Sequence, residues 1–99
     1  MRYEVILAPQ AVEDLRSLKA GARAEFLDAL EQHLRYEPTK TSRSRIKRLR
    51  GLSRPQYRLR VENVRVFFDI AGDTVEVLAI VAEDQAQAWL ERKGVSDKR

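Results

Sequence analysis

Three arginines interrupt the apolar residues of the segment YRLRVENVRVFFDI, which spans residues 57–70. Alternation of apolar and polar residues is typical of a β-strand with one buried face. Arg58, Arg60 and Arg65 therefore fall on the side opposite the apolar residues. The planar guanidinium group stays ionised and matches phosphate oxygens with paired hydrogen bonds. The three side chains thus predict a phosphate-binding face on a β-sheet.

The pairing register of this segment indicates a hairpin with two different faces. With Glu62-Asn63 as a two-residue turn, every facing pair on one side is apolar or aromatic, as expected of a core face. Those pairs are Val61 with Val64, Leu59 with Val66, and Tyr57 with Phe68. On the other side Arg60 faces Arg65, and like charges directly opposite one another are destabilising. Such a local cost is typical of a functional site.

A second turn signal, Gly72-Asp73, extends the hairpin to three antiparallel strands. It predicts a third strand over 75–81 that continues the apolar face of the first two. The predicted core pairs are Ile70 with Val75, Phe68 with Val77, Val66 with Ala79, and Val64 with Val81. On the arginine side, the predicted pairs are Phe67 with Leu78 and Arg65 with Ile80.

The remaining elements follow from apolar spacing and from the placement of proline and glycine. They are a strand over 2–8, a helix over 10–19 entered at Pro9 and broken at Gly21, a helix over 22–36 ended by Pro38, a polar and basic loop over 39–56, and a helix from about Asp84 to Gly94. Residues 95–99 are expected to form a frayed tail. The order β-α-α-β-β-β-α predicts the α+β class, with a small antiparallel sheet that carries an N-terminal helical hairpin on one face.

Composition and length place these elements in a single domain spanning residues 1–99. The chain is 43% hydrophobic and 34% charged, which is typical of a folded globular protein. It has no cysteine, and no other side chains show metal-ligand spacing, so neither a metal nor another cofactor is expected. No apolar run reaches the roughly 20 residues of a membrane span, and we expect a cytoplasmic protein without membrane contact.

Positive charge is concentrated in one third of the chain. From Arg35 to Arg65 there are eleven lysines and arginines against two acids, whereas the whole chain has a net charge of only +4. A basic block of this density either binds a polyanion, through counterion release and electrostatic steering, or forms a solvated loop.

The order and spacing of several short motifs resemble the RelE/ParE family of toxins from bacterial type II toxin–antitoxin modules. The motifs are YEVILAPQAVEDLRSL at residues 3–18, IKRLRG at 46–51, YRLRVENVRVFF at 57–68 and VEVLAIV at 75–81. The resemblance covers about residues 2–92 and implies a RelE-like fold. It also implies a toxin that either cleaves mRNA in the ribosomal A site, as in the RelE branch, or inhibits DNA gyrase, as in the ParE branch.

The basic block and the three strand arginines favour the RelE branch. The resemblance then implies a ribosome-dependent, metal-independent mRNA endoribonuclease that inhibits translation. Its implied partners are a cognate antitoxin, the ribosome with its mRNA and ribosomal RNA, and operator DNA only through the antitoxin. Two alternatives stay open: a ParE-like, non-catalytic inhibitor of gyrase, and a degenerate toxin that acts only with its antitoxin.

The resemblance also assigns roles to single residues. Arg58, Arg60 and Arg65 are similar to the family positions that supply catalytic cations in RelE-type nucleases. Two positions depart from that pattern, because Glu83 stands where a further arginine is expected and Trp89 stands where a tyrosine is expected. Glu83 is either the general base that accepts a proton from the ribose 2′-hydroxyl or a counter-charge that neutralises Arg65 and weakens the nuclease.

The expected RNA-binding residues combine basic side chains, which can contact the phosphate backbone, with one aromatic ring that can stack on a base. They are Arg43, Arg45, Lys47, Arg48, Arg50, Arg54 and Trp89. Other titratable side chains carry less weight. His33, the only histidine, is expected beside the apolar stripe of the second helix, and Glu13 and Asp14 are expected on the solvated face of the first.

Overall fold

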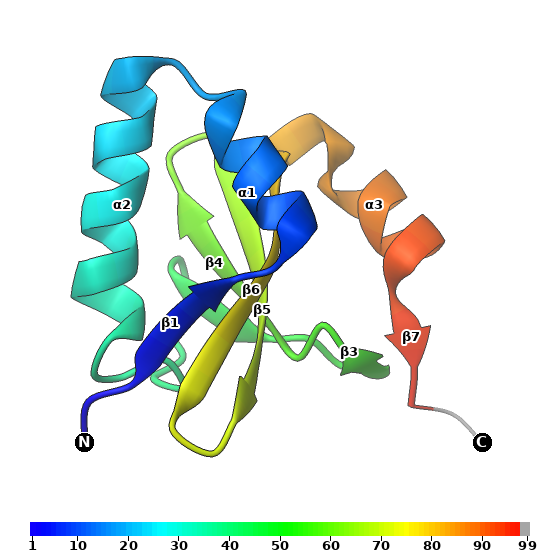
Figure 1. Cartoon of the computed structure of the whole chain (residues 1–99). Helices are drawn as coiled ribbons and strands as arrows, with labels where there is room; N and C mark the ends of the chain where they lie inside the picture. The colour runs from blue at the N-terminus through cyan, green and yellow to red at the C-terminus, as the bar shows by residue number, and fades with distance from the viewer. Residues whose placement is uncertain (98–99) are drawn as a thin grey trace.

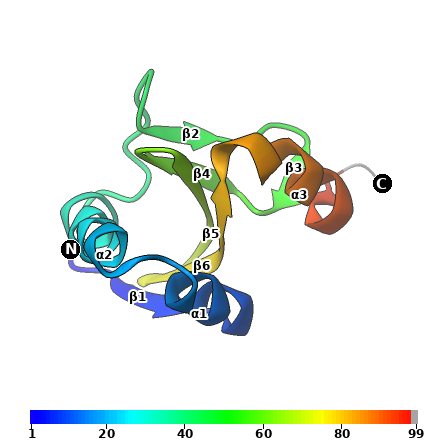
Figure 2. The ribbon, with the colours of Figure 1, turned by 90° about the horizontal axis from the view of Figure 1, so that it is seen from above.

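The computed structural model describes residues 1–97 and has a five-stranded sheet with helices on both faces (Figure 1). The elements in chain order are β1 (Glu4–Leu7), α1 (Pro9–Arg16), α2 (Ala20–Leu34), β2 (Ile46–Arg48), β3 (Leu52–Arg54), β4 (Tyr57–Val61), β5 (Val64–Ala71), β6 (Thr74–Ala82), a 3₁₀ turn η1 (Glu83–Gln85), α3 (Ala86–Lys93) and β7 (Val95–Ser96). Seen from above, α2 lies on the concave side of the curved sheet and α3 on the opposite side (Figure 2). The predicted α+β class is confirmed.

The sheet is mixed, with the strand order β1-β6-β5-β4-β2. The antiparallel pairing expected from the sequence holds for β4, β5 and β6, and the unpredicted strand β2 also pairs antiparallel with β4, whereas β1 runs parallel to β6. A strand joined to its neighbour by a tight turn must be antiparallel. No such turn joins β1 to β6, because two helices and four strands lie between them in the sequence. Its direction therefore does not follow from local turn signals. Within residues 1–97 no helix is long and apolar enough to cross a membrane.

A β-bulge makes the β5–β6 register differ from the prediction. The β4–β5 hairpin has the predicted pairs throughout, and β5–β6 begins in the predicted register beside its turn. Between Phe67 and Phe68 the pairing then shifts by one residue, so that Val66 faces Ile80 instead of Ala79. The other shifted pairs are Val64 with Ala82, Arg65 with Val81, and Phe67 with Ala79. An extra residue on one strand, here Leu78, is the defining feature of such a bulge.

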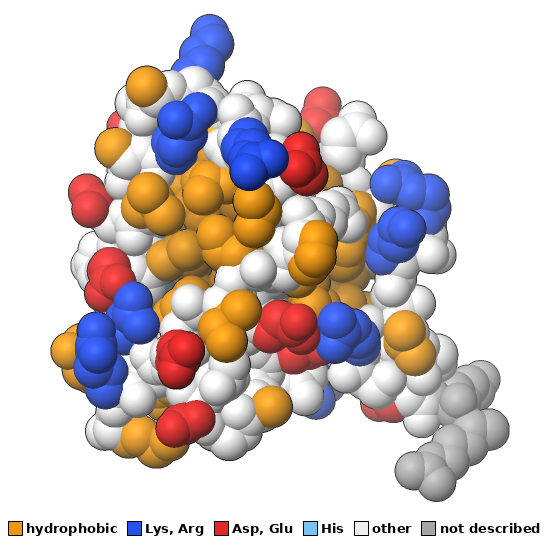
Figure 3. Space-filling model, in the orientation of Figure 1, with side chains coloured by type: hydrophobic (Ala, Val, Ile, Leu, Met, Phe, Trp, Pro, Cys, Tyr) orange, Lys and Arg blue, Asp and Glu red, His pale blue; other side chains and the backbone are white. Residues whose placement is uncertain are grey.

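The bulge divides β6 between two hydrophobic cores. The larger core lies between the sheet and the helices α1 and α2, and Ile80 belongs to it, although the sequence placed Ile80 on the arginine side. The smaller core lies under α3 and consists of Phe67, Leu78, Ala79 and Trp89. Figure 3 shows apolar side chains gathered on the face where α1 and α2 lie.

The carboxylate of Asp14 closes an open edge of β6. Because β1 pairs with β6 only as far as Val77, no strand lies on that side of β6 beyond this point among the described residues, while β5 continues along the other side. Asp14 Oδ2 accepts the N–H of Ile80 there, at 2.9 Å. The sequence placed Asp14 on a solvated face, which is wrong, because this bond is partly buried. Its neighbour Glu13 is exposed, as expected, and pairs with Arg16 at 3.1 Å.

The segment predicted as the loop 39–56 contains two short strands. The first, β2, pairs with β4, and the second, β3, pairs with β7 near the C-terminal end. Residues Val95–Ser96, predicted as part of a frayed tail, are therefore held in a two-stranded sheet, while 98–99 lie outside the described residues. The helical hairpin also turns earlier than predicted, at residues 17–19, and Gly21 lies inside α2.

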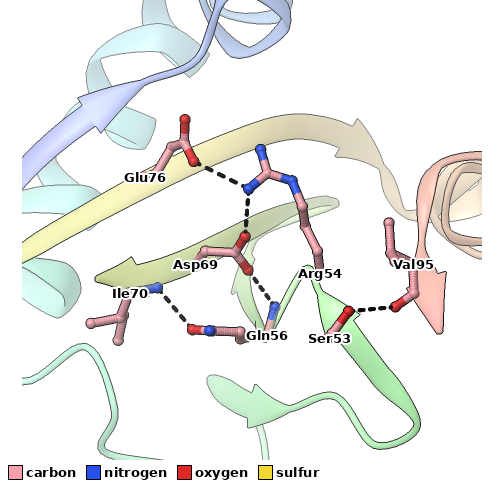
Figure 4. Close-up of polar contacts among 7 residues, drawn as sticks. All are labelled: Ser53, Arg54, Gln56, Asp69, Ile70, Glu76 and Val95. Atoms are coloured by element: carbon pink, nitrogen blue, oxygen red, sulfur yellow. Dashed lines mark hydrogen bonds and ion pairs between the residues drawn. The ribbon is translucent and has the colours of Figure 1, made fainter. Parts of the chain in front are cut away.

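A polar network anchors the end of this segment to β5 and β6 (Figure 4). Arg54 pairs with Asp69 at 3.0 Å and with Glu76 at 3.4 Å. The backbone N–H of Gln56 donates to Asp69 at 2.7 Å, and the Gln56 side-chain oxygen accepts the N–H of Ile70 at 2.9 Å. Burial raises the pKa of the Asp69 carboxyl above its ordinary value, although Gln56 and Arg54 oppose the rise.

We expect Asp14→Ala to destabilise the fold by about 1–3 kcal/mol, because it leaves the Ile80 N–H without its acceptor in a partly buried position. The free energy of unfolding, measured by urea denaturation, checks this. Glu13→Ala is the matched control and should cost about 0.5 kcal/mol or less, since it removes a carboxylate from the same helix at an exposed position. Equal losses in the two variants would contradict a structural role for Asp14.

We expect Asp69→Asn to change how stability depends on pH. A raised carboxyl pKa means that the folded chain binds this proton more tightly than the unfolded chain. The stabilising contribution is present below the ordinary value of 3.8 and is lost as the pH rises through the folded value. The stability of the wild type relative to Asp69→Asn should therefore fall across that window in pH-dependent urea denaturation. A constant difference would contradict the raised pKa.

A candidate phosphate-binding face

The strands β4 and β5 bring Arg58, Arg60 and Arg65 to one face of the sheet. Arg60 faces Arg65 across the hairpin, and Arg58 faces Phe67, as the sequence predicted. The three guanidinium groups repel one another. Burial lowers the pKa of Arg58, and the positive charges of Arg65 and Arg60 lower it further. We call the surface formed by these three side chains the arginine face.

Arg65 is the most enclosed of the three, with only 9% of its surface exposed. One of its terminal nitrogens donates to the backbone oxygens of Glu62 at 3.2 Å and Val64 at 3.1 Å. The other pairs with Glu83 Oε1 at 2.8 Å, and the side chain of Glu83 is 54% exposed. Glu83 thus reaches the arginine face, held by the 3₁₀ turn that follows β6. Its backbone N–H also bonds to the oxygen of Asn63 in the β4–β5 turn, at 2.8 Å.

Arg58 carries a hydrogen-bond donor without an acceptor. Its Nε is buried and has no hydrogen-bond partner among the residues that the structure describes. A buried donor left unpaired costs on the order of 1–3 kcal/mol. Together with the repulsion from Arg60 and Arg65, this leaves Arg58 in a position where a bound oxyanion would supply the missing counter-charge.

Arg60 gives the arginine face its opening to solvent. Its side chain is exposed and lines a hollow of about 280 Å³ together with Ser44, Arg45 and Glu62. Arg45 is fixed beside β4, because its backbone oxygen accepts the N–H of Arg60 at 2.9 Å. A ligand phosphate can therefore approach from the β4–β2 edge of the sheet.

Trp89 has a structural position that was not expected. Its ring is only 5% exposed and stacks on Phe67, with the ring centroids 4.8 Å apart and the planes 5° from parallel. The indole ring therefore presents no open face to an RNA base, which argues against the base-stacking role predicted for it. The spacing of Ala86, Trp89 and Leu90 on α3 was the signal for burial, and all three contribute to the smaller core.

The basic residues expected to bind RNA fall into two groups. Arg48 and Arg54 are engaged within the fold: Arg48 donates to Gln56 at 2.7 Å and lies over the Tyr57 ring, 5.2 Å from its centroid, and Arg54 pairs with Asp69 and Glu76. The others lie before, within or just after β2 and are exposed, and of these Arg45 also donates to the backbone oxygen of Arg60, at 3.3 Å. They are Arg43, Arg45, Lys47 and Arg50.

The arginine face combines fixed positive charge with two nearby carboxylates, Glu83 beside Arg65 and Glu62 in the hollow that Arg60 lines. Among residues 1–97 no group of three or more histidine, aspartate or glutamate side chains could hold a metal ion. The face can therefore bind and stabilise a phosphate through its guanidinium groups. Glu83, which contacts Arg65 directly, is the carboxylate that we consider as a proton acceptor.

Solved structures of toxins share this fold. A chain of the archaeal RelE–RelB complex from Pyrococcus horikoshii is 26% identical, with a TM-score of 0.69 over 84% of this chain and 97% of that chain. A chain of the RelBE2 toxin–antitoxin complex from Mycobacterium tuberculosis is 23% identical, with a TM-score of 0.68 over 83% of this chain and 99% of that chain.

A third likeness is an arginine-to-alanine mutant of Escherichia coli RelE in the free state, which is 17% identical with a TM-score of 0.68 over 94% of this chain and 99% of that chain. At 17% and 23% identity, the E. coli and M. tuberculosis likenesses show the fold alone. No functionally curated protein matches the sequence significantly.

A family model decides the assignment. The model describes the ParE toxin of the type II toxin–antitoxin system parDE, and it matches residues 5–87, which include the whole arginine face and Glu83. The RelE/ParE resemblance and the RelE-like fold predicted from the sequence are both confirmed. The chain belongs to the ParE toxin family of type II toxin–antitoxin systems.

Proposed function

We propose that this toxin inhibits translation by cleaving mRNA on the ribosome, with the scissile phosphate bound on the arginine face. The observation that carries the proposal is Arg58, a half-buried guanidinium group that is repelled by Arg60 and Arg65 and whose buried Nε lacks an acceptor. The repulsion among these cations lowers the stability of the free protein, and a bound phosphate would remove it. Local strain of this kind is typical of a ligand-binding site. The structural likeness to archaeal RelE supports the same branch of the family.

In this reaction the ribose 2′-hydroxyl attacks the adjacent phosphorus and a 2′,3′-cyclic phosphate forms as the bond to the 5′-oxygen breaks. Arg58 and Arg60 stabilise the extra negative charge of the phosphorane. Glu83 accepts the proton of the 2′-hydroxyl, and water supplies a proton to the departing 5′-oxygen. Arg65 acts as a positioning residue, since its side chain is held by two backbone oxygens and presents its remaining nitrogen to Glu83.

The exposed basic residues around β2 give the proposed toxin its contact with RNA. Arg43, Arg45, Lys47 and Arg50 contact the phosphate backbone of ribosomal RNA or mRNA, without reading its sequence. Such contacts release counterions, so binding should weaken steeply with salt. Their position at the β4–β2 edge continues the opening through which Arg60 reaches solvent.

A cognate antitoxin is the proposed protein partner. The P. horikoshii and M. tuberculosis likenesses come from complexes of toxin with antitoxin. The apolar side chains gathered where α1 and α2 lie (Figure 3) form a surface of the kind that a protein partner covers. Contact with operator DNA is proposed only through this antitoxin.

Glu83→Gln tests the catalytic part of this proposal. We expect it to lower ribosome-dependent mRNA cleavage by roughly a hundredfold or more, because glutamine cannot accept the proton. Glutamine still accepts a hydrogen bond from Arg65, so the melting temperature should change little. Cleavage is measured by primer extension on ribosome-bound mRNA across a pH series. Undiminished cleavage by Glu83→Gln would exclude Glu83 as the base, and a more active Glu83→Arg would show that Glu83 silences the arginine face.

Inhibition of DNA gyrase is the second candidate function. It is favoured by the match to the ParE model and by the Arg65–Glu83 pair, which neutralises one of the three arginines. We expect induction of the toxin to stop protein synthesis, measured by amino-acid incorporation, before any DNA-damage response begins. The purified toxin should leave gyrase supercoiling unchanged. The opposite pair of results would replace the nuclease by a gyrase inhibitor.

A further inference from the structure

A second polar hollow lies between the C-terminal end of α2 and the segment that leads into β2. It has a volume of about 400 Å³. Its lining includes His33 from α2 and five residues of the run TKTSRSR at 39–45. Those five are Lys40, Thr41, Ser42, Ser44 and Arg45. All six side chains can donate hydrogen bonds, and two of them carry a permanent positive charge.

Backbone contacts fix the shape of this hollow. The N–H of Ser42 donates to the oxygen of Ile46 at 2.9 Å, and the N–H of Arg45 donates to Ser42 Oγ at 2.9 Å. The Arg45 side chain also bonds to the backbone oxygen of Arg60 at 3.3 Å. The one acid in the lining, Glu37, lies 3.8 Å from Lys40. No ion pair joins Arg45 to an acid among the described contacts.

The hollow and the arginine face are connected through Arg45. This side chain lines both the 400 Å³ hollow and the 280 Å³ hollow that contains Arg60. From residue 38 to residue 61 the sequence holds nine lysines and arginines and no acid. Lysine and arginine side chains therefore extend from the arginine face, around the β2 edge of the sheet, to the C-terminal end of α2.

We propose that the hollow between His33 and Arg45 is a second phosphate site, which holds a backbone phosphate of the RNA strand whose scissile phosphate lies on the arginine face. The RNA part of this inference rests on the proposed nuclease function. The site itself rests on the hydroxyl and cationic donors of the lining, which suit a phosphate and cannot accept hydrogen bonds from a cationic ligand as readily.

His33 reports on the occupancy of this site. It is the only histidine in the chain, so its imidazole signals in an NMR spectrum are unambiguous. Burial lowers the pKa of His33, and the nearby charge of Arg45 lowers it further. The charged groups facing the imidazole across the hollow are Glu37, Lys40 and Arg45. A bound phosphate offsets the positive charges and should raise the pKa of His33.

The test follows the His33 signals of the full chain during titration with inorganic phosphate and, separately, with a short 2′-O-methyl RNA that cannot be cleaved. Both ligands should shift the signals in a saturable way and raise the pKa of His33. Arg45→Gln should weaken both affinities by roughly tenfold, since it removes a charged hydrogen bond. Arg92→Gln is the matched control and should change neither, because Arg92 is exposed on α3, across the molecule from α2 (Figure 1). Lys40→Gln provides a second variant if Arg45→Gln fails to fold.

The outcomes separate this site from the nuclease proposal. RNA binding detected by fluorescence anisotropy without a shift at His33 would overturn the second phosphate site and leave the nuclease proposal standing. A shift with inorganic phosphate but none with RNA would overturn the RNA assignment. A shift with both ligands, lost in Arg45→Gln, would support the site even if no mRNA cleavage were found.

Discussion

The register of β4 against β5 is the constraint on which the rest of the structure depends. Side chains alternate between the two faces of a strand, so a slip of one residue would exchange the core face for the arginine face. With Leu59 opposite Val66, both residues are fully buried in the larger core. The same pairing forces Arg60 against Arg65 on the other side. The accumulation of charge is therefore a direct consequence of making the core.

The molecule compensates this charge only in part. Glu83 pairs with Arg65 and leaves Arg58 and Arg60 without an acidic partner in the described contacts, although Arg58 is half-buried. Arg65 is therefore held in place by Glu83, whereas Arg58 and Arg60 stay available to a ligand. The 3₁₀ turn makes it possible, because it brings the chain back to the β4–β5 turn directly after β6. The helix α3 then covers the neighbouring apolar part of the same face with Trp89.

The sequence was sufficient for features that depend on local pattern. The β4–β5 register followed from placing the turn at Glu62-Asn63, which puts Val61 opposite Val64, Leu59 opposite Val66 and Tyr57 opposite Phe68 on one apolar face. The bulge did not follow, because Val66 makes an apolar pair with either Ala79 or Ile80, and only packing under α3 distinguishes them. The strands β2, β3 and β7 are two or three residues long, too short for an alternation to be recognised. The bond from Asp14 to Ile80 joins residues that are distant in the sequence, and no pattern in either segment indicates it.

The same distinction applies to the candidate site. The grouping of the three arginines was predictable because they lie on adjacent strands of one hairpin. The stacking of Trp89 on Phe67 and the engagement of Arg54 were not, since both depend on partners supplied by other parts of the fold, Phe67 for the first and Asp69 with Glu76 for the second. A basic side chain in a loop can bind a ligand or hold the loop in place, and composition does not separate the two.

The small sheet formed by β3 and β7 has a topological consequence. It joins Leu52 to Ser96 and Arg54 to Val95, so the chain between them forms a closed circuit whose two ends meet. The arginine face, Glu83 and α3 all lie within that circuit, whereas β1 and the helical hairpin lie outside it. The pairing of β3 with β7 thus closes the part of the chain that carries both the three arginines and Glu83.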